Sequence, residues 1–156
     1  MIELDAIDRK ILSVLQADGN LPQREIADRV GLSQNACWRR IRRLTDTGVI
    51  AGYTTRLDTG RLGLDLTVFV LIQTSHHNAD WSKSFHDEIS QIDGIVDAYR
   101  IGGEWDYLLK VVTTSMSGYD RVYQELTQRV PGLDRVTGLF AMEELFSNLP
   151  LPIQAR

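Results

Sequence analysis

Four arginines lie close together in one short stretch of the sequence: Arg39, Arg40, Arg42 and Arg43. Ser33 can begin a helix here, because its hydroxyl can accept hydrogen bonds from the amides of the first turn. Gly48 can end that helix, because glycine adopts the left-handed backbone conformation without steric cost. Guanidinium groups bind phosphate oxygens and the edges of bases. The stretch therefore predicts a short cationic helix that lies in a DNA groove.

The same stretch separates an apolar face from a polar one. Cys37, Ile41 and Leu44 recur at the spacing of a single buried helix face. The polar residues expected to contact DNA are Ser33, Gln34, Asn35, Trp38, Arg39, Arg40, Arg42 and Arg43. Among them the two amide side chains and Arg39 are candidates for base edges, and the other arginines are candidates for phosphates. The alternative is a plain solvated face, which is the usual role of a basic run on a helix.

Two further helices are predicted before this one. Asp5 can cap a helix whose apolar residues keep a period of about 3.6 residues, and the run Asp18-Gly19-Asn20 ends it. Pro22 fits the first turn of a second helix that runs to about Val30, and Gly31 follows directly. This order of elements is that of a helix-turn-helix, in which one helix supports another that reads DNA.

The charge of the chain is unevenly distributed. The 156 residues carry a net charge of -4, and the sequence pI is near 5.3, which at first argues against a DNA-binding protein. Residues 1–60 hold nine Lys and Arg against eight Asp and Glu, a net charge of +1, whereas residues 61–156 have a net charge of -5. Since charges are screened over ~8 Å at physiological salt, the local arginines matter most for contact with phosphates.

The composition also limits where the protein is expected to work. The sequence contains no run of about eighteen apolar residues and no signal peptide, so we expect a cytoplasmic protein without a membrane partner. The single cysteine, Cys37, cannot form an internal disulfide. We expect it to be a small core residue rather than a redox sensor.

The second half of the sequence alternates strand and helix patterns. Strand composition marks Leu66 to Gln73, Ile95 to Ile101, Tyr107 to Val112 and Val136 to about Phe146. Helical spacing of apolar residues marks Trp81 to Ile92 and Tyr119 to Val130. The order βαββαβ predicts a ferredoxin-like sandwich, with both helices on one face of an antiparallel sheet, and an α+β fold overall.

Three regions follow from these patterns. Residues 1–48 are predicted to form a winged-helix-like helix-turn-helix domain that binds DNA, and residues 65–156 a ferredoxin-like domain for ligand binding and oligomerisation. Residues 49–64 are predicted to be an extended strand linker, because strand formers run from Val49 to Leu57 and turn residues follow.

The predicted sheet offers more apolar surface than two helices can cover. The residues that form this surplus surface are Phe69, Leu71, Ile101, Leu109, Val111, Leu139, Phe140, Met142 and Leu145. We expect the uncovered face or edge to pair with a second copy in an isologous dimer. Such a dimer would hold two recognition helices at half-sites ~34 Å apart, which is one turn of DNA.

A set of motifs occurs in a fixed order along the chain: Leu4–Leu12, Gly31-Leu32-Ser33, Arg39–Leu44, Gly48-Val49-Ile50, Gly52-Tyr53 and Gly103–Leu109. With these motifs the chain resembles the leucine-responsive/asparagine-regulator (Lrp/AsnC) family of bacterial and archaeal transcription factors over essentially its whole length. The resemblance implies a sequence-specific regulator of double-stranded DNA and not an enzyme. It also implies that the sandwich binds a small effector, usually an amino acid, and that dimers assemble into tetramers or octamers.

The resemblance further implies an effector site at one loop: Gly102, Gly103, Glu104, Trp105 and Asp106. Glycines let backbone amides approach a carboxylate, and either acidic residue of the loop could balance an ammonium group. Taken from the residues alone, a plain tight turn between two strands is the alternative.

Other kinds of function find little support in the sequence. Metal ligands are one possible role of His76, His77 and His86. Adjacent histidines on a strand, however, point to opposite faces, and no cysteine lies nearby in the sequence, so we expect no metal and no other cofactor. No nucleophile is paired with a base and no phosphate-binding loop occurs, so we expect no catalytic residues. A protein that organises DNA without an effector is the remaining alternative.

Overall fold

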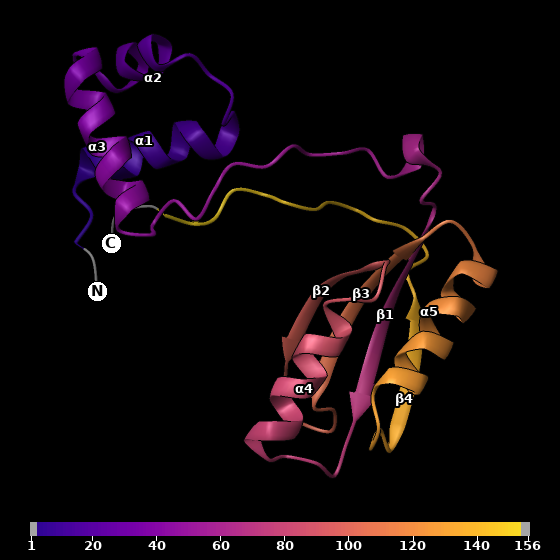
Figure 1. Ribbon diagram of the computed structural model, residues 1–156. Coiled ribbons are helices and arrows are strands. Elements are labelled where there is room, and N and C mark those ends of the chain that lie inside the picture. Colours follow the sequence, from indigo (N-terminus) through magenta and orange to yellow (C-terminus); the bar gives the residue numbers. More distant parts are fainter. Residues whose placement is uncertain (1–2, 154–156) are drawn as a thin grey trace. The chain divides into compact units, whose positions relative to one another are not determined.

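The computed structural model of the protein describes residues 3–153, which form two compact units (Figure 1). The first, called the head, contains the chain up to Arg56 together with the segment from Phe146 onward. The second, called the sheet unit, contains Leu57–Leu145. Each unit has its own core of buried apolar side chains, as expected of separate domains.

The helices of the head are α1 (Ala6–Ala17), α2 (Gln23–Val30) and α3 (Gln34–Asp46). α1 begins with a capping box: the side chain of Asp5 accepts from the amide of Asp8, and the side chain of Asp8 accepts from the amide of Asp5. Gly31 ends α2 in the left-handed conformation, and Ser33 caps α3 directly afterwards. These elements confirm the predicted helix-turn-helix.

One apolar face of each helix builds the core of the head. Its buried members are Ile11, Leu12, Ile26, Ala27, Val30, Cys37 and Leu44. Cys37 and Leu44 belong to the apolar face predicted for α3, and Ile41 between them is half buried. α3 therefore leaves its opposite side to solvent.

The sheet unit follows the predicted βαββαβ order. Its elements are β1 (Leu66–Gln73), α4 (Ala79–Ile89), β2 (Ile95–Arg100), β3 (Tyr107–Thr113), α5 (Met116–Arg129) and β4 (Arg135–Phe140). Neighbouring strands are antiparallel, and their order across the sheet is β2-β3-β1-β4. Both helices pack on the same face of the sheet, which gives the ferredoxin-like arrangement (Figure 1).

The helix-covered face of the sheet is the core of this unit. Val68 and Val70 of β1 lie there, and their cross-strand partners are Val111 and Leu109 of β3. The prediction that Leu109 and Val111 belong to the surplus apolar surface is wrong. The register turns both side chains toward the helices, where they are fully buried.

The opposite face of the sheet carries several exposed apolar side chains, and neither α4 nor α5 packs on it. Phe69 of β1 and Leu139 of β4 lie directly across from each other, and their side chains are 36% and 50% exposed. Leu71 lies on the same face, two residues further along β1. Met142 and Leu145, after the end of β4, are strongly exposed as well. Phe140, another predicted member, instead lies across from Val68 and contacts Tyr119 of α5, so the surplus surface exists with fewer members than expected.

The linker and the C-terminal segment differ from their predictions. Residues 51–58 pair with no strand of the described chain, and a short 3-10 helix, Gly60–Leu62, follows them. β4 ends at Phe140, and from Phe146 the chain belongs to the head rather than to the predicted domain of residues 65–156. Strand composition alone does not make a strand, because the backbone amides and carbonyls also need a neighbour to bond with.

Candidate nucleic-acid interface and effector loop

The predicted DNA-binding residues lie on α3 or just before it. Ser33 caps the helix, with its hydroxyl oxygen 3.3 Å from the amide nitrogen of Ala36, and Gly48 follows the helix with a φ of 73°. The exposed polar side chains of α3 include Gln34, Asn35, Trp38, Arg39 and Arg42. The helix thus presents amides, an indole and guanidinium groups to solvent.

Arg40 and Arg43 turn instead toward α1. Arg40 Nη1 lies 2.6 Å from Asp5 Oδ2 and 2.9 Å from Asp8 Oδ1, and Arg43 Nη2 donates to Asp8 Oδ2. The side chain of Asp8 is fully buried, whereas those of Arg40 and Arg43 are 30% and 50% exposed. We call these four residues the charge clamp. Carboxylates of the same unit thus pair with Arg40 and Arg43, and the expectation that these two arginines meet phosphates stays a prediction.

Arg39 and Arg42 lie on the solvent side of α3. Arg42 Cζ lies 5.2 Å from the centroid of the Trp38 ring, a cation–π contact, and Arg42 Nε lies 3.7 Å from Asp46 Oδ2. Arg39 is exposed and forms no ion pair with any residue in the range 3–153. The four neighbouring arginines therefore divide into two that pair with Asp5 and Asp8, of which Arg43 stays half exposed, and two that lie on the solvent side of α3.

The charge clamp shifts the pKa values of its members. The amide of Asp8 and the guanidinium of Arg40 donate to Asp5, and they lower the pKa of its carboxyl from the ordinary value of 3.8 to about 2. Asp5 and Asp8 in turn accept from Arg40 and raise its pKa above the usual range. The sequence prediction missed the role of Asp8. Two features of the sequence could have indicated this role. Asp8 follows Asp5 at the spacing of a capping box, and Arg40 and Arg43 are three residues apart, on one face of their helix.

The predicted effector loop joins β2 to β3, and Asp106 anchors it. Asp106 Oδ2 accepts from the amide of Thr74 at 2.8 Å, and Asp106 Oδ1 lies 3.9 Å from His77 Nδ1. Gly102 and Gly103 are exposed, and Gly103 has a φ of 123°, which favours glycine. Asp106 thus holds the loop against the end of β1, which is a structural role that the sequence did not predict.

Glu104 and Trp105 meet a residue that the sequence prediction missed, Arg135 at the start of β4. Arg135 Nη1 lies 3.4 Å from Glu104 Oε1, and Arg135 Cζ lies 4.6 Å from the centroid of the Trp105 ring. Gln73 Nε2 donates to the carbonyl of Glu104 at 3.2 Å. No local pattern identifies Arg135, because only the pairing of β1 with β4 brings it to the loop. The loop thereby combines a carboxylate, a guanidinium and an indole.

The histidines and the cysteine have ordinary surroundings. His76 stacks on Trp81, with ring centroids 6.0 Å apart, and His86 lies near Asp87. Burial raises the pKa of the Cys37 thiol, as expected of a core cysteine. Among the described residues, no three His, Cys, Asp or Glu side chains lie together in a way that could hold a metal ion. Within that part of the chain, no helix has the length and apolar character needed to cross a membrane.

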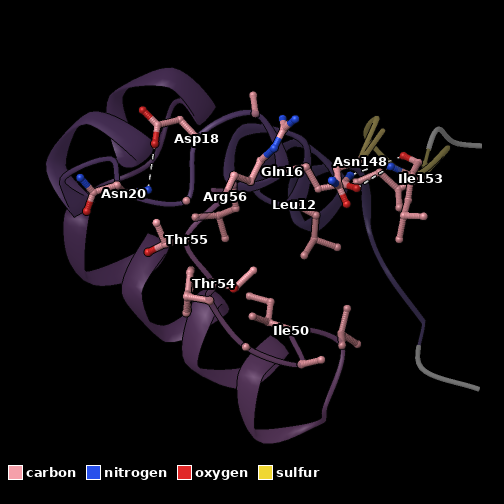
Figure 2. A pocket seen from close by; sticks show the side chains of 18 of the residues that line it. Leu12, Gln16, Asp18, Asn20, Ile50, Thr54, Thr55, Arg56, Asn148 and Ile153 are labelled. Atoms are coloured by element: carbon pink, nitrogen blue, oxygen red, sulfur yellow. Dashed lines mark hydrogen bonds between the residues drawn. The ribbon is translucent and has the colours of Figure 1, made fainter. Parts of the chain in front are cut away.

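The head also contains an open cavity of about 940 Å³ that the sequence did not predict (Figure 2). Leu12 and Ile50 are among its apolar lining residues, and Gln16 binds the C-terminal segment beside it. The amide of Leu151 donates to Gln16 Oε1 at 2.6 Å, and Gln16 Nε2 donates to the carbonyl of Leu151 at 3.4 Å. Ile153 packs against the core of the head. A side-chain amide thus bonds the backbone of this segment as a neighbouring strand would.

Comparison with known proteins identifies the family. Residues 4–51 match the family described as winged helix-turn-helix DNA-binding, and residues 67–151 match the Lrp/AsnC ligand binding domain. The chain is 41% identical to the DNA-binding transcriptional activator DecR of Escherichia coli (strain K12), over 97% of this chain and 99% of that one. The chain therefore belongs to the Lrp/AsnC family of transcriptional regulators, which are not enzymes, as the resemblance predicted.

Solved structures of family members have the same fold. An AsnC family transcriptional regulator from Agrobacterium tumefaciens has a TM-score of 0.91 and 37% identity, over 96% of this chain and 97% of that one. A transcriptional regulator from Neisseria meningitidis, solved as a complex with L-Met, has a TM-score of 0.89 and 28% identity, over 97% of both chains. These likenesses confirm the predicted α+β fold.

Replacing Asp5 by asparagine tests the charge clamp. Because the pKa of Asp5 is about 2 in the folded head and 3.8 ordinarily, the unfolded chain binds more protons between these values. The wild-type head must therefore lose stability as the pH falls from about 5 to about 2. Asparagine also caps helices well, so Asp5→Asn removes mainly the charge. We expect a shallower loss of stability in this variant over the same pH range.

The measurement is urea unfolding at several pH values, followed by the reaction of Cys37 with a thiol reagent that works in acid. Cys37 is the single cysteine of the sequence and is buried in the head, so its exposure reports unfolding of that unit. Asp28→Asn, on an exposed position of α2, is the matched control. An Asp5→Asn head with the pH dependence of the wild type would contradict the clamp.

Proposed function

We propose that this transcriptional regulator reads DNA with the exposed side of α3 and that an amino acid bound at loop 102–106 controls its action. One observation carries the proposal: Arg40 and Arg43 are paired with Asp5 and Asp8, while Arg39 and Arg42 lie on the solvent side of α3. A protein with an acidic overall charge thereby keeps a local cationic surface beside side chains that can read bases.

Each exposed side chain of α3 suits one part of a DNA duplex. The amides of Gln34 and Asn35 can both donate to and accept from a base edge, as they do at adenine. Arg39 can bind a guanine edge with two parallel hydrogen bonds. Arg42 suits a phosphate, and its contact with Trp38 restrains its position. Base readout therefore belongs to the first half of α3, and backbone contact to Arg42.

An amino acid is a suitable effector because it carries both a carboxylate and an ammonium group. Glu104 and Arg135 form an exposed ion pair, so a bound amino acid can replace it by pairing with both partners. Trp105 lies beside Arg135 and offers an apolar wall for the side chain of the ligand. The Neisseria meningitidis relative was solved with L-Met, which supports this class of effector. A protein that organises DNA without an effector is the alternative.

The uncovered face of the sheet suits a dimer interface. Phe69 and Leu139 are apolar, exposed and directly opposite each other, and such surfaces usually associate. An isologous dimer presents two copies of α3, which suits half-sites ~34 Å apart. Growth into tetramers or octamers rests on the family resemblance, and a cytoplasmic location rests on the sequence pattern; both stay predictions.

Substitutions at Arg42 and Arg39 separate the two modes of DNA contact. Removing one phosphate contact reduces the magnitude of the slope of log affinity against log salt concentration by about 0.9. We therefore expect Arg42→Gln to weaken binding to all duplexes alike and to reduce the slope by that amount. Arg39→Gln is expected to cost about 1–3 kcal/mol of binding free energy on a specific duplex only.

Both effects are measured by fluorescence anisotropy, on a duplex selected from a random pool and on its scrambled version, over a range of salt concentrations. Arg121→Gln, on an exposed position of α5, is the matched control and should bind like the wild type. If the binding isotherms of both α3 variants were unchanged, the assignment of Arg39 and Arg42 to the DNA interface would be wrong.

Glu104→Gln tests the effector site. A ligand that binds only the folded protein raises its melting temperature, so a thermal-shift screen with each standard amino acid detects the effector in the wild type. We expect Glu104→Gln to lose that shift, because it loses the charge for the ammonium group, and to keep the affinity for DNA. Asp120→Asn on α5 is the control. If Glu104→Gln kept the full shift in melting temperature, the effector site would lie elsewhere. If the wild type showed no shift, the effector-independent alternative would be favoured.

Leu139→Glu tests the dimer interface. A charge placed on the uncovered apolar face should prevent association, because it cannot be buried without a partner. Light scattering should then give the mass of one 17.7 kDa chain for the variant and a multiple of it for the wild type. Met116→Glu, at an exposed position on the helix side of the sheet unit, should leave the mass of the wild type unchanged. Equal masses for Leu139→Glu and the wild type would exclude this face.

A further inference from the structure

The buried carboxylate of Asp8 connects α1 to the helix that carries the exposed arginines. Both of its oxygens are used: Oδ1 accepts from Arg40, and Oδ2 accepts from Arg43 and, at 3.2 Å, from the amide of Asp5. An ionised carboxylate outside water is costly unless it is paired and hydrogen-bonded. The head keeps Asp8 buried because α3 holds two guanidinium groups against it.

These ion pairs fix α3 in a way that its apolar packing does not. Cys37 and Leu44 anchor the helix by contacts that have no preferred direction, so a small rotation about the helix axis changes their burial little. A guanidinium nitrogen, in contrast, must lie within reach of a particular oxygen. Arg40 and Arg43 are three residues apart and share one face of the helix. Two such anchor points on one face determine how far the helix is rotated.

The rotation of α3 decides where the DNA-facing side chains point. Arg39 and Arg42 each precede a clamp arginine by one position, which corresponds to about 100° around the helix. When Arg40 and Arg43 are held on α1, the other two arginines lie at a fixed angle from α1, on the solvent side. Base edges are recognised through oriented hydrogen bonds, so specificity depends on this angle more than bulk attraction to phosphates does.

We propose that Asp8 is a positioning residue of the DNA interface, which acts through Arg40 and Arg43 to set the rotation of α3 and thereby the sequence specificity. The inference rests on the proposed function, because it assumes that α3 enters the DNA. The two carboxylates and two guanidinium groups of the clamp sum to no net charge. Within the arginine cluster we therefore expect Arg39 and Arg42, rather than the clamp arginines, to account for most of the salt dependence of binding.

The position of α3 can be followed without DNA through Cys37. This single cysteine is buried on the inner face of α3. In Asp8→Asn the neutral amide cannot balance two guanidinium groups, so α3 should open more often, and we expect Cys37 to react with a thiol reagent about tenfold faster or more. Circular dichroism at the same temperature establishes that the variant is still folded. A rate equal to that of the wild type would overturn the proposal.

Milder variants keep the test valid where Asp8→Asn does not fold. Arg43→Gln leaves Asp8 paired with Arg40, and Arg43→Lys keeps a positive charge within reach of Asp8. We expect the thiol reagent to react with Cys37 faster in Arg43→Gln than in the wild type. In Arg43→Lys we expect a reaction rate closer to that of the wild type. No rescue by lysine would contradict the role of the ion pair.

Binding of the full chain to DNA then distinguishes positioning from simple loss of structure. We expect Arg43→Gln to weaken binding to the selected duplex about tenfold, to leave the scrambled duplex nearly unchanged and to keep the wild-type salt slope, in contrast to the loss of about 0.9 in Arg42→Gln. If Arg43→Gln lowered the slope as Arg42→Gln does, Arg43 would contact a phosphate and the proposal would be wrong. Equal losses on both duplexes would also overturn it.

The outcome also separates this inference from the proposed function. A wild-type chain that binds neither duplex would overturn both the DNA assignment and the effect of Asp8 on specificity. An accelerated reaction of Cys37 in Asp8→Asn would in that case still show that Asp8 holds α3. Normal DNA binding by the wild type with an unchanged Cys37 rate in Asp8→Asn would overturn the inference alone.

Discussion

The DNA-facing side of this protein depends on one buried carboxylate. Asp8 sits at the start of α1, where the capping box with Asp5 helps to fix its position. Its charge is stable inside the head only because Arg40 and Arg43 are brought to it from α3. The same contact decides which arginines are left for solvent. A helix cap, a buried ion pair and a DNA-binding surface are therefore parts of a single arrangement.

The sheet unit meets a different constraint, the burial of apolar surface. One face of the sheet is covered by α4 and α5, and the other leaves apolar side chains such as Phe69 and Leu139 exposed. The loop between β2 and β3 adds polar chemistry at one end, where Glu104 meets Arg135. This unit is inserted into the sequence of the head, which it joins after Arg56 and again before Phe146. The sheet unit, which carries the loop, is thus joined by two segments of the chain to the unit that carries α3.

Much of the fold could be predicted because its signals are local. The strand Leu66–Gln73 was predicted with the bounds that the structure has, since a short unbroken run of strand formers lies between turn residues. The caps at Asp5 and Ser33 were predicted because a cap involves only the first turn of its helix. The prediction of a strand in the linker after Val49 was wrong, because a strand also requires a hydrogen-bonding partner elsewhere in the chain or in another chain.

The sequence by itself determined where the helices and most of the strands form, that one helix is cationic, and which family the chain resembles. The tertiary structure alone decided which guanidinium groups are free, because the partner of Arg40 lies 32 residues away, at Asp8. It likewise decided that Arg135 reaches Glu104, 31 residues away. Periodicity and capping report interactions within a few residues. The neighbours of a charged side chain, in contrast, follow from how whole elements dock, and that depends on the burial of apolar faces far from the charge.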